Sequence, residues 1–200
     1  MASSRSARRS PVVASASSVH TIKVALRGAR PPIWRRLEVP SSSTLEQLHH
    51  IIQNAFGWYN CHLWVFETPL GEYGMTDPEL GHRSAASKRL RDVAPRTSCQ
   101  LRYTYDFGDD WQHDILVEDV KNAEPGTAYP RCITGRRACP PEDCGGIWGY
   151  EELVAILSDP EHGEHEERLE WLGLESADEF DPADFDAAEV NTALSPLAST

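Results

Sequence analysis

The 200-residue chain has no long apolar run. No stretch approaches the ~18 consecutive apolar residues that a membrane span requires, and the mean hydropathy of −0.47 is that of a polar chain. We therefore expect a soluble, cytoplasmic protein without a membrane segment. At this length roughly 70% of the unfolded surface can be buried, which is enough for a core without disulfides.

Several signatures of chemistry are also missing. The cysteines number five, which disfavours a fully paired secreted disulfide framework, and none belongs to the C-x-x-C pair of a zinc ribbon. No serine lies in the nucleophile elbow of a hydrolase. The sequence therefore contains no recognised nucleophile arrangement and favours a protein that is not an enzyme.

Acidic residues are absent from positions 1–37, which carry eight basic side chains. The balance then reverses, because residues 140–200 carry seventeen acidic side chains and one basic side chain. Lys and Arg supply most of the affinity for phosphates, so the C-terminal third would repel DNA. Weak nucleic-acid binding is expected only at the basic N-terminal segment, through Arg5, Arg8, Arg9, Arg27, Arg30, Arg35 and Arg36.

The pattern along the chain predicts three regions. Residues 1–18 are rich in Ser, Ala and Arg and contain no aromatic side chain, so they are predicted to form a disordered tail. Residues 19–194 are expected to form a single α+β domain. Residues 195–200 are expected to form a flexible C-terminus.

Alternation and helical spacing predict a β-grasp-like mixed sheet of ββαβ order followed by a long hairpin. Residues 19–26 and 33–39 alternate as paired strands, and residues 44–56 have a capping box, helical spacing and a terminal glycine. A strand is expected at 62–68, a long surface loop at 69–88, and a hairpin over 101–107 and 111–117. This fold by itself indicates no function.

The acidic C-terminal third is predicted to be helical. Apolar spacing indicates a helix over 149–158, and Asp-Pro pairs at 159–160 and 181–182 predict the starts of helices that end near Trp171 and Leu194. We expect these helices to pack on the sheet with their carboxylates in water.

Cys132, Cys139 and Cys144 lie in a loop rich in glycine and proline. Three thiolates with a fourth ligand could hold a structural zinc ion, and His113 is the predicted fourth ligand. Such a closed site would stabilise the loop and leave no position for water. The alternative is a loop of reduced, buried thiols that behave as small apolar side chains.

The segment YDFGDDWQHD places Asp106, Asp109 and Asp110 at one tight turn. Clustered carboxylates suit Mg²⁺ or Mn²⁺ and phosphoryl chemistry, although turns also select Asp and Gly for conformational reasons. His162 and His165 share a helical face, but they lack the HExxH register of a zinc protease. These histidines are interpreted as residues of an exposed acidic helix.

Five motifs together resemble the plasmid pRiA4b ORF-3-like family, over about residues 19–190. The resemblance implies a bacterial α+β protein without an established activity, whose relatives are sometimes described as resolvase-like passengers of mobile elements. It supports the positions Asp106, Asp109, Asp110, His113, Cys132, Cys139 and Cys144, and indicates no reaction. Where the family often has His-Leu-His, this chain has His62, Leu63 and Trp64. The motifs are PPIWRRLEVP, TLEQLHHIIQNAFGW, YTYDFGDDWQH, YPRCITGRRACPPEDCGG and WGYEEL.

Three hypotheses of function follow. The first is a non-enzymatic protein-binding or adaptor module that presents a tryptophan-rich surface to a protein partner of unknown identity. The family resemblance associates such a module with mobile elements. The second is a metal-dependent hydrolase or nuclease that uses Asp106, Asp109 and Asp110. The third is weak nucleic-acid binding by the basic N-terminal segment. The sequence favours the first, because the chain is acidic and has no evident nucleophile.

Overall fold

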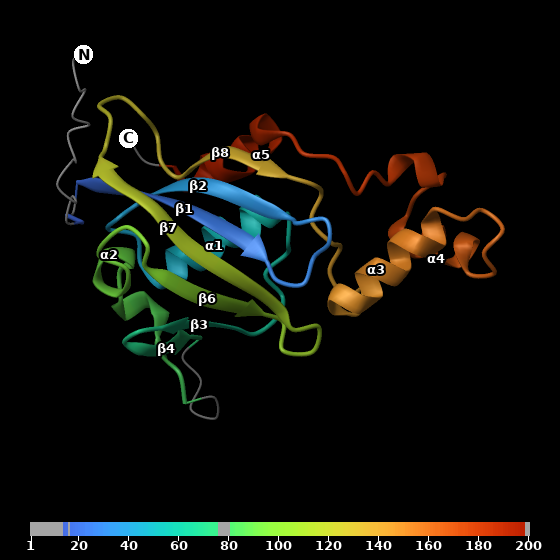
Figure 1. Ribbon diagram of the computed structural model, residues 1–200, viewed down its shortest axis with the longest axis horizontal. Helices are drawn as coiled ribbons and strands as arrows, with labels where there is room; N and C mark the ends of the chain where they lie inside the picture. The colour runs from blue at the N-terminus through green and yellow to red at the C-terminus, as the bar shows by residue number, and fades with distance from the viewer. Residues whose placement is uncertain (1–13, 16, 76–80, 199–200) are drawn as a thin grey trace, which may run out of the picture.

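The computed structural model describes residues 14–15, 17–75 and 81–198 (Figure 1). Most of the predicted tail therefore lies outside the described residues, and Ser18 already begins the first strand. The strands are β1 (Ser18–Leu26), β2 (Trp34–Pro40), β3 (Trp64–Thr68), β4 (Gly71–Gly74), β5 (Arg83–Ser84), β6 (Gln100–Tyr105), β7 (Trp111–Asn122) and β8 (Arg131–Arg136). The α-helices are α1 (Leu45–Phe56), α2 (Leu90–Val93), α3 (Gly146–Leu157), α4 (His165–Leu172) and α5 (Ala187–Leu194).

The described strands form one mixed sheet in the order β5-β4-β3-β6-β7-β1-β2-β8. Neighbouring strands are antiparallel except for the short parallel pair β4 and β5. The predicted α+β class is confirmed. The chain order β1, β2, α1, β3 is compatible with the β-grasp-like interpretation.

The predicted hairpins are confirmed. In β1, buried and partly exposed residues alternate from His20 to Leu26, and the strand pairs with β2 and with β7. The β6–β7 hairpin joins this pair to β3. Period-2 alternation produces a sheet with one face toward the core, and here that face carries Ile22, Val24 and Leu37.

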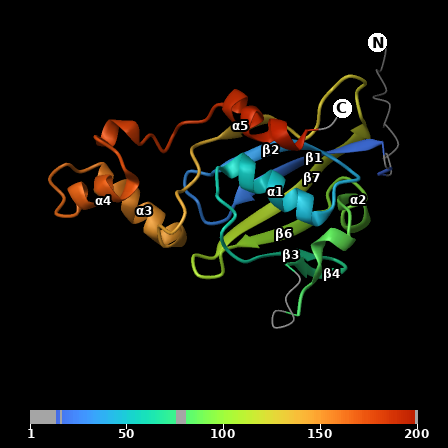
Figure 2. The same cartoon turned by 180° about the vertical axis from the view of Figure 1, so that it is seen from behind.

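Helix α1 covers the core face of the sheet, as the two opposite views show (Figures 1 and 2). Its predicted capping box is confirmed, because Gln47 N donates to Thr44 Oγ1 and Thr44 N donates to Gln47 Oε1. Gly57 ends the helix in the left-handed conformation. Leu45, Leu48 and Ile52 are fully buried against the sheet, so amphipathic spacing predicted this layer correctly.

The predicted long loop at 69–88 is wrong in its described part. Residues 71–74 form β4, residues 83–84 form β5, and residues 85–87 form a single 3-10 turn. Strands of four and two residues are too short to display an alternation, so the pattern could not reveal them.

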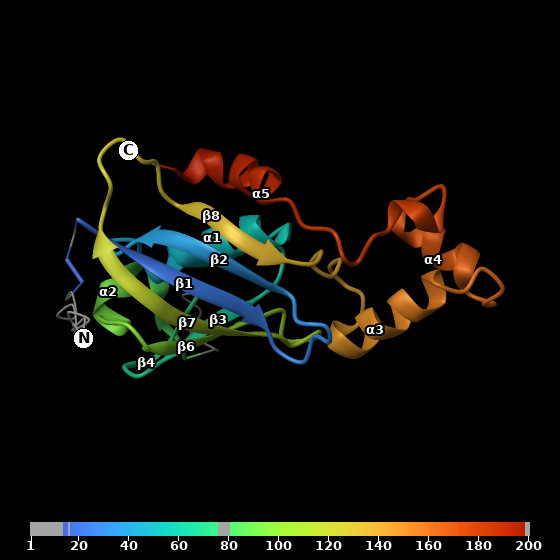
Figure 3. The ribbon, with the colours of Figure 1, turned by 45° about the horizontal axis from the view of Figure 1, so that its top comes forward.

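The acidic C-terminal third is helical, but two predicted helix starts are wrong. Helix α4 begins at His165 and α5 at Ala187, whereas Asp159 and Asp181 accept backbone N–H groups within turns. Helices α3 and α4 project away from the sheet, and α5 returns beside β8 (Figure 3). Leu153, Leu157 and Leu169 form a small separate core between α3 and α4.

No helix among the described residues has the length and apolar character needed to cross a membrane. Residues 195–197, within the predicted flexible C-terminus, form a 3-10 turn.

Candidate metal centre

Three loops meet at one end of the sheet. The first connects α1 to β3 and carries Cys61 and His62, the second follows β6 and begins at Asp106, and the third precedes α3 and carries Glu142 and Asp143. The first two are joined directly, since Asp106 N donates to the Leu63 carbonyl at 2.8 Å. The third loop adds residues about eighty positions from the first, since Asp143 lies within contact distance of His62.

His62, Asp106 and Asp143 form one group of potential metal ligands, with all three ligand atoms within 4.8 Å of one another. Nε2 of His62 lies 3.0 Å from Asp143 Oδ1 and 3.6 Å from Asp106 Oδ2. This nitrogen is fully buried and makes no hydrogen bond of normal geometry. At 3.0 Å the contact with Asp143 has the distance of an ion pair, which a protonated ring would make, and a cation held between the three atoms is the second arrangement that satisfies this nitrogen.

The two carboxylates differ in their surroundings. Asp106 is buried, and its Oδ1 accepts a hydrogen bond from Gly108 N at 2.9 Å, which leaves Oδ2 toward His62. The Asp143 side chain is 66% exposed. Both aspartates adopt a left-handed backbone conformation, which Asp tolerates better than most residues. The group therefore has a fixed inner carboxylate and an outer one open to solvent.

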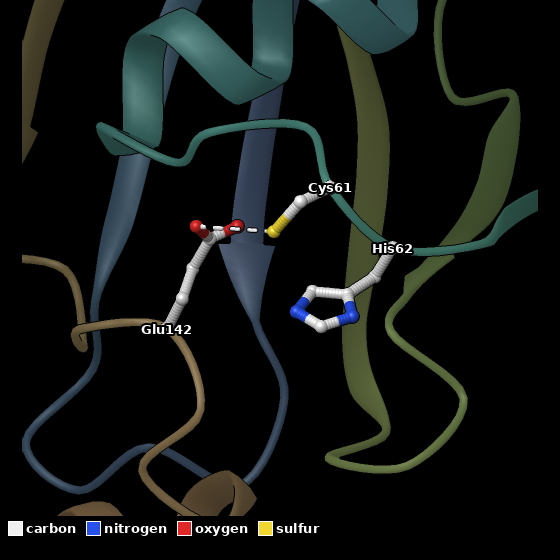
Figure 4. A group of neighbouring side chains, drawn as sticks. All are labelled: Cys61, His62 and Glu142. Carbon is white, nitrogen blue, oxygen red and sulfur yellow. Dashed lines mark hydrogen bonds between the residues drawn. The ribbon is translucent and has the colours of Figure 1, made fainter.

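Cys61, His62 and Glu142 form a second group that shares His62 (Figure 4). Cys61 Sγ lies 3.7 Å from Glu142 Oε2. The Tyr105 hydroxyl donates to Glu142 Oε1 at 2.5 Å and accepts from Cys61 N at 3.0 Å. Burial, followed by the hydrogen bond to Glu142, raises the pKa of Tyr105, so the phenol keeps the proton that it donates.

A buried polar network supports the loop that carries Cys61 and His62. His49 Nε2 contacts Asn60 Oδ1 at 2.5 Å, its Nδ1 contacts Tyr103 Oη at 2.7 Å, and Asn60 N donates to Gln53 Oε1. The His49 ring also stacks on Trp64 with centroids 4.0 Å apart. Burial lowers the pKa of His49 to about 3, so the ring is neutral and acts as a structural support.

The structure separates the three predicted aspartates. Asp106 belongs to a candidate metal group, whereas Asp109 Oδ2 accepts from Gly145 N at 3.1 Å. Both oxygens of Asp110 accept from the side-chain amide of Gln112. Two of the three carboxylates therefore stabilise the turn and its contact with the next loop, as turn residues commonly do.

The structure does not bring the predicted zinc ligands together. No group of three ligand atoms within 4.8 Å among the described residues includes Cys132, Cys139, Cys144 or His113. Cys139 Sγ instead accepts from Arg35 Nη2 at 3.0 Å. Burial raises the pKa of the Cys139 and Cys144 thiols to about 12, which disfavours the thiolates that zinc needs. Zinc binding by this set stays a prediction.

His113 is enclosed by aromatic side chains. Its ring centroid lies 4.9 Å from that of Phe56, 5.2 Å from Trp58 and 5.4 Å from Tyr103, and neither ring nitrogen makes a hydrogen bond of normal geometry. His165, on α4, is buried with Nδ1 3.1 Å from the Ile156 carbonyl, so this histidine has a packing role.

The arginines proposed for nucleic-acid contact are only partly available. Arg5, Arg8 and Arg9 lie outside the described residues. Arg35 is 4% exposed, and Arg36 is paired with Glu118, so neither presents a free charge to a polyanion. Arg27 donates to Gln112 at 2.7 Å.

Sequence reasoning missed four members of the two groups, namely Cys61, His62, Glu142 and Asp143. The motif CPPEDC was interpreted through its cysteines alone, although its two consecutive carboxylates stand in a loop rich in proline and glycine. That juxtaposition was the available signal. Their convergence with His62 depends on contacts between distant segments, which no local pattern reports.

Comparison with known proteins identifies a matching family, a sequence relative and a similar solved structure. Residues 18–189 match the family described as plasmid pRiA4b ORF-3-like protein. An uncharacterized protein, y4hQ, of Sinorhizobium fredii (strain NBRC 101917 / NGR234) is 37% identical over 186 residues, covering 92% of this chain and 94% of the relative. The crystal structure of a protein of unknown function, MM3350 from Methanosarcina mazei Go1, has a TM-score of 0.77 and 37% identity, covering 86% of this chain and 96% of the other. The chain belongs to the plasmid pRiA4b ORF-3-like protein family.

Proposed function

We propose that this domain binds a divalent metal ion at His62, Asp106 and Asp143 and uses it to activate water for hydrolysis. The observation that carries the proposal is the convergence of the buried Nε2 of His62 with carboxylate oxygens of two other loops, at 3.0 and 3.6 Å, without a hydrogen bond of normal geometry. This is the sequence-derived hydrolase hypothesis with a different ligand set, in which Asp106 is retained.

The charge of the group suits a divalent cation. A neutral imidazole and two carboxylates provide three donors and a total charge of −2, which balances one divalent ion. Three protein ligands leave coordination positions for water, and a bound metal ion lowers the pKa of that water toward neutrality. The exposed Asp143 lies on the side from which solvent and substrate would enter.

Metal binding should depend on Asp106 and be independent of Asp110. Calorimetric titration of the full chain with Mn²⁺ or Zn²⁺ is expected to give about one ion per chain, with affinity at least about tenfold weaker in Asp106→Asn, which loses a ligand. Asp110→Asn is the matched control, because its carboxylate lies on the same turn, accepts from Gln112 and belongs to neither of the two candidate groups. Equal affinities of the two variants would contradict the proposal.

Hydrolysis is tested separately from binding. With bis(4-nitrophenyl) phosphate as a probe of phosphodiesterase chemistry, the metal-loaded protein should release nitrophenolate, and Asp106→Asn should be inactive while Asp110→Asn is active. A protein that binds metal through Asp106 but hydrolyses neither this probe nor an ester or amide probe would refute the catalytic part of the proposal and leave the metal centre intact.

A protein-binding module is the second candidate function, and one observation favours it. Trp148, in the first turn of α3, is 82% exposed beside an open groove of ≈ 750 Å³ that also contains Arg27 and Arg30. Tryptophan and arginine dominate the energetics of many protein interfaces. A photo-crosslinker at position 148 should capture one specific partner in the native host, whereas the same probe at Tyr59, which is 84% exposed, should not.

A further inference from the structure

We infer that the groove beside Trp148 docks a second copy of this chain, so that the protein forms a two-fold symmetric dimer. The inference rests on the second candidate function, protein binding, and names the partner. Three segments line the groove, namely the connection between β1 and β2, the turn between β6 and β7, and the first turns of α3 (Figure 3). Its charged and aromatic lining residues are Arg27, Arg30, Asp109, Asp110, Trp148 and Glu151.

Hydrogen bonds between the three segments fix the shape of the groove. Arg27 N donates to the Gln112 carbonyl at 2.8 Å, which ties the β1–β2 connection to the start of β7. Gly145 N donates to Asp109 Oδ2 at 3.1 Å, which ties the start of α3 to the β6–β7 turn. A groove that is already formed in the free protein loses little conformational entropy when a partner docks.

Trp148 supplies the apolar contact. Its side chain is 82% exposed, although burial of a tryptophan removes about 150–250 Å² of surface from water. Glu151 follows three positions later, so both side chains lie on the same side of α3. In a two-fold contact this side of α3 is used twice, once from each copy, and both tryptophans become buried.

The free charges of the groove have both signs and lie on different walls. Arg30 belongs to the β1–β2 connection and Glu151 to α3, and both are exposed. Within the described part of the chain, neither takes part in an ion pair or a side-chain hydrogen bond. Arg27, in contrast, lies 3.5 Å from Asp114, and Asp110 accepts from a side-chain amide. The groove therefore offers one free cation and one free anion to a partner.

A partner that carries one sign of charge fits this groove poorly. Asp109, Asp110 and Glu151 would repel a polyanion such as nucleic acid, and the two arginines would repel a basic segment. A second copy brings both signs in the required arrangement, because a two-fold contact pairs residue i with j and also j with i. Arg30 of each copy then faces Glu151 of the other, and such complementary charges fix the register of the contact.

Sedimentation equilibrium of the full chain tests the inference at about 0.15 M salt, where a Debye length of about 8 Å screens the repulsion between two chains of net charge −12. We expect the mass to rise with concentration from 22.3 kDa toward twice that value. Trp148→Ala should weaken the dimer at least about tenfold. Tyr59→Ala, at an equally exposed aromatic residue outside the groove, should leave it unchanged.

Exchange of the two free charges tests the arrangement itself. Arg30→Glu and Glu151→Arg should each weaken the dimer at least about tenfold, because like charges then face each other across the contact. The double variant Arg30→Glu/Glu151→Arg restores opposite charges and should dimerise within about threefold of the native chain. Circular dichroism of each variant confirms that it is folded.

The outcomes separate this inference from the second candidate function. A mass that stays at 22.3 kDa at every concentration would overturn the inference, and the candidate function would stand if a crosslinker at Trp148 still captured a different protein in the host. Failure of both dimerisation and capture would refute both. A dimer that Trp148→Ala and the single charge reversals leave unchanged uses another surface, which would also overturn the inference.

Discussion

The protonation of His113 should weaken the fold in mild acid. The side chain is fully buried, and burial lowers its pKa from 6.5 to about 4, although backbone groups of Tyr103 and Trp111 oppose part of that effect. In the unfolded chain the imidazole regains its ordinary pKa and takes up a proton below about pH 6.5. The buried ring of the folded state does not take up that proton until about pH 4. The unfolding free energy therefore falls as the pH decreases from about 6.5 to about 4, and it levels off below that range.

The size of the effect follows from the two pKa values. A difference of about 2.5, at about 1.36 kcal/mol for each unit, corresponds to a total loss of about 3 kcal/mol. Between pH 7 and pH 5 the contribution of this residue is about 2 kcal/mol. This is a large fraction of the ~5–15 kcal/mol that stabilises a typical domain.

Replacement of His113 by Phe isolates this contribution. Phe keeps a ring among Phe56, Trp58 and Tyr103 and removes two nitrogens that lack normal hydrogen bonds. Urea unfolding followed by tryptophan fluorescence should show that the loss of unfolding free energy from pH 7 to pH 5 is about 2 kcal/mol smaller in His113→Phe than in the native chain.

The exposed His162 provides the control, and His162→Gln should leave the pH dependence unchanged. Equal pH dependence in the native chain and in His113→Phe would refute the reasoning. If His113 were instead a zinc ligand, as the sequence predicts, His113→Phe would lower stability at pH 7 in zinc-containing buffer and make the protein insensitive to a chelator.

Three further predictions concern the interior and the cysteine loop. Arg35→Lys should lower the unfolding free energy by about 2–4 kcal/mol in urea titrations. The buried guanidinium donates to three backbone carbonyls and to Cys139, and a lysine side chain cannot reach all four acceptors. A change below about 0.5 kcal/mol would contradict this prediction. Gly149→Ala should reduce the melting temperature measured by circular dichroism, since the added methyl group would overlap the Cys144 carbonyl oxygen, while Gly163→Ala, where nothing lies nearby, should not. If the cysteine loop binds zinc, a chelator and Cys139→Ser should lower the melting temperature equally. Purified native protein that contains no zinc would leave only the alternative interpretation, a loop of reduced thiols.

Elements with a strong local signal were predictable from the sequence. The helix at 45–56 combined apolar spacing, a capping box and a terminal glycine, and all three features are present in the structure. The two hairpins were predictable because one face of each strand is buried, which imposes alternation. Elements without such periodicity, such as β4 and β5, were missed.

Two helix starts in the acidic third were predicted wrongly, because an Asp-Pro pair occurs both at helix starts and in turns. An Asp-Pro pair can begin a helix, but Asp also accepts backbone N–H groups in a turn. At Asp159 and Asp181 the turn is formed, and the helices begin later, at His165 and Ala187. The choice depends on how each helix packs, which local sequence does not report.

The candidate metal centre shows most clearly which features local sequence determines and which depend on the tertiary structure. Sequence alone determined the α+β class, the main helix, the hairpins and the position of Asp106 near the turn of the second hairpin, because each is a property of a short segment. Only the tertiary structure decided that Asp106 faces His62 and Asp143, whereas Asp109 and Asp110 serve the turn. A metal group is a set of distances between segments far apart in the chain, and those distances are determined by the packing of the whole sheet.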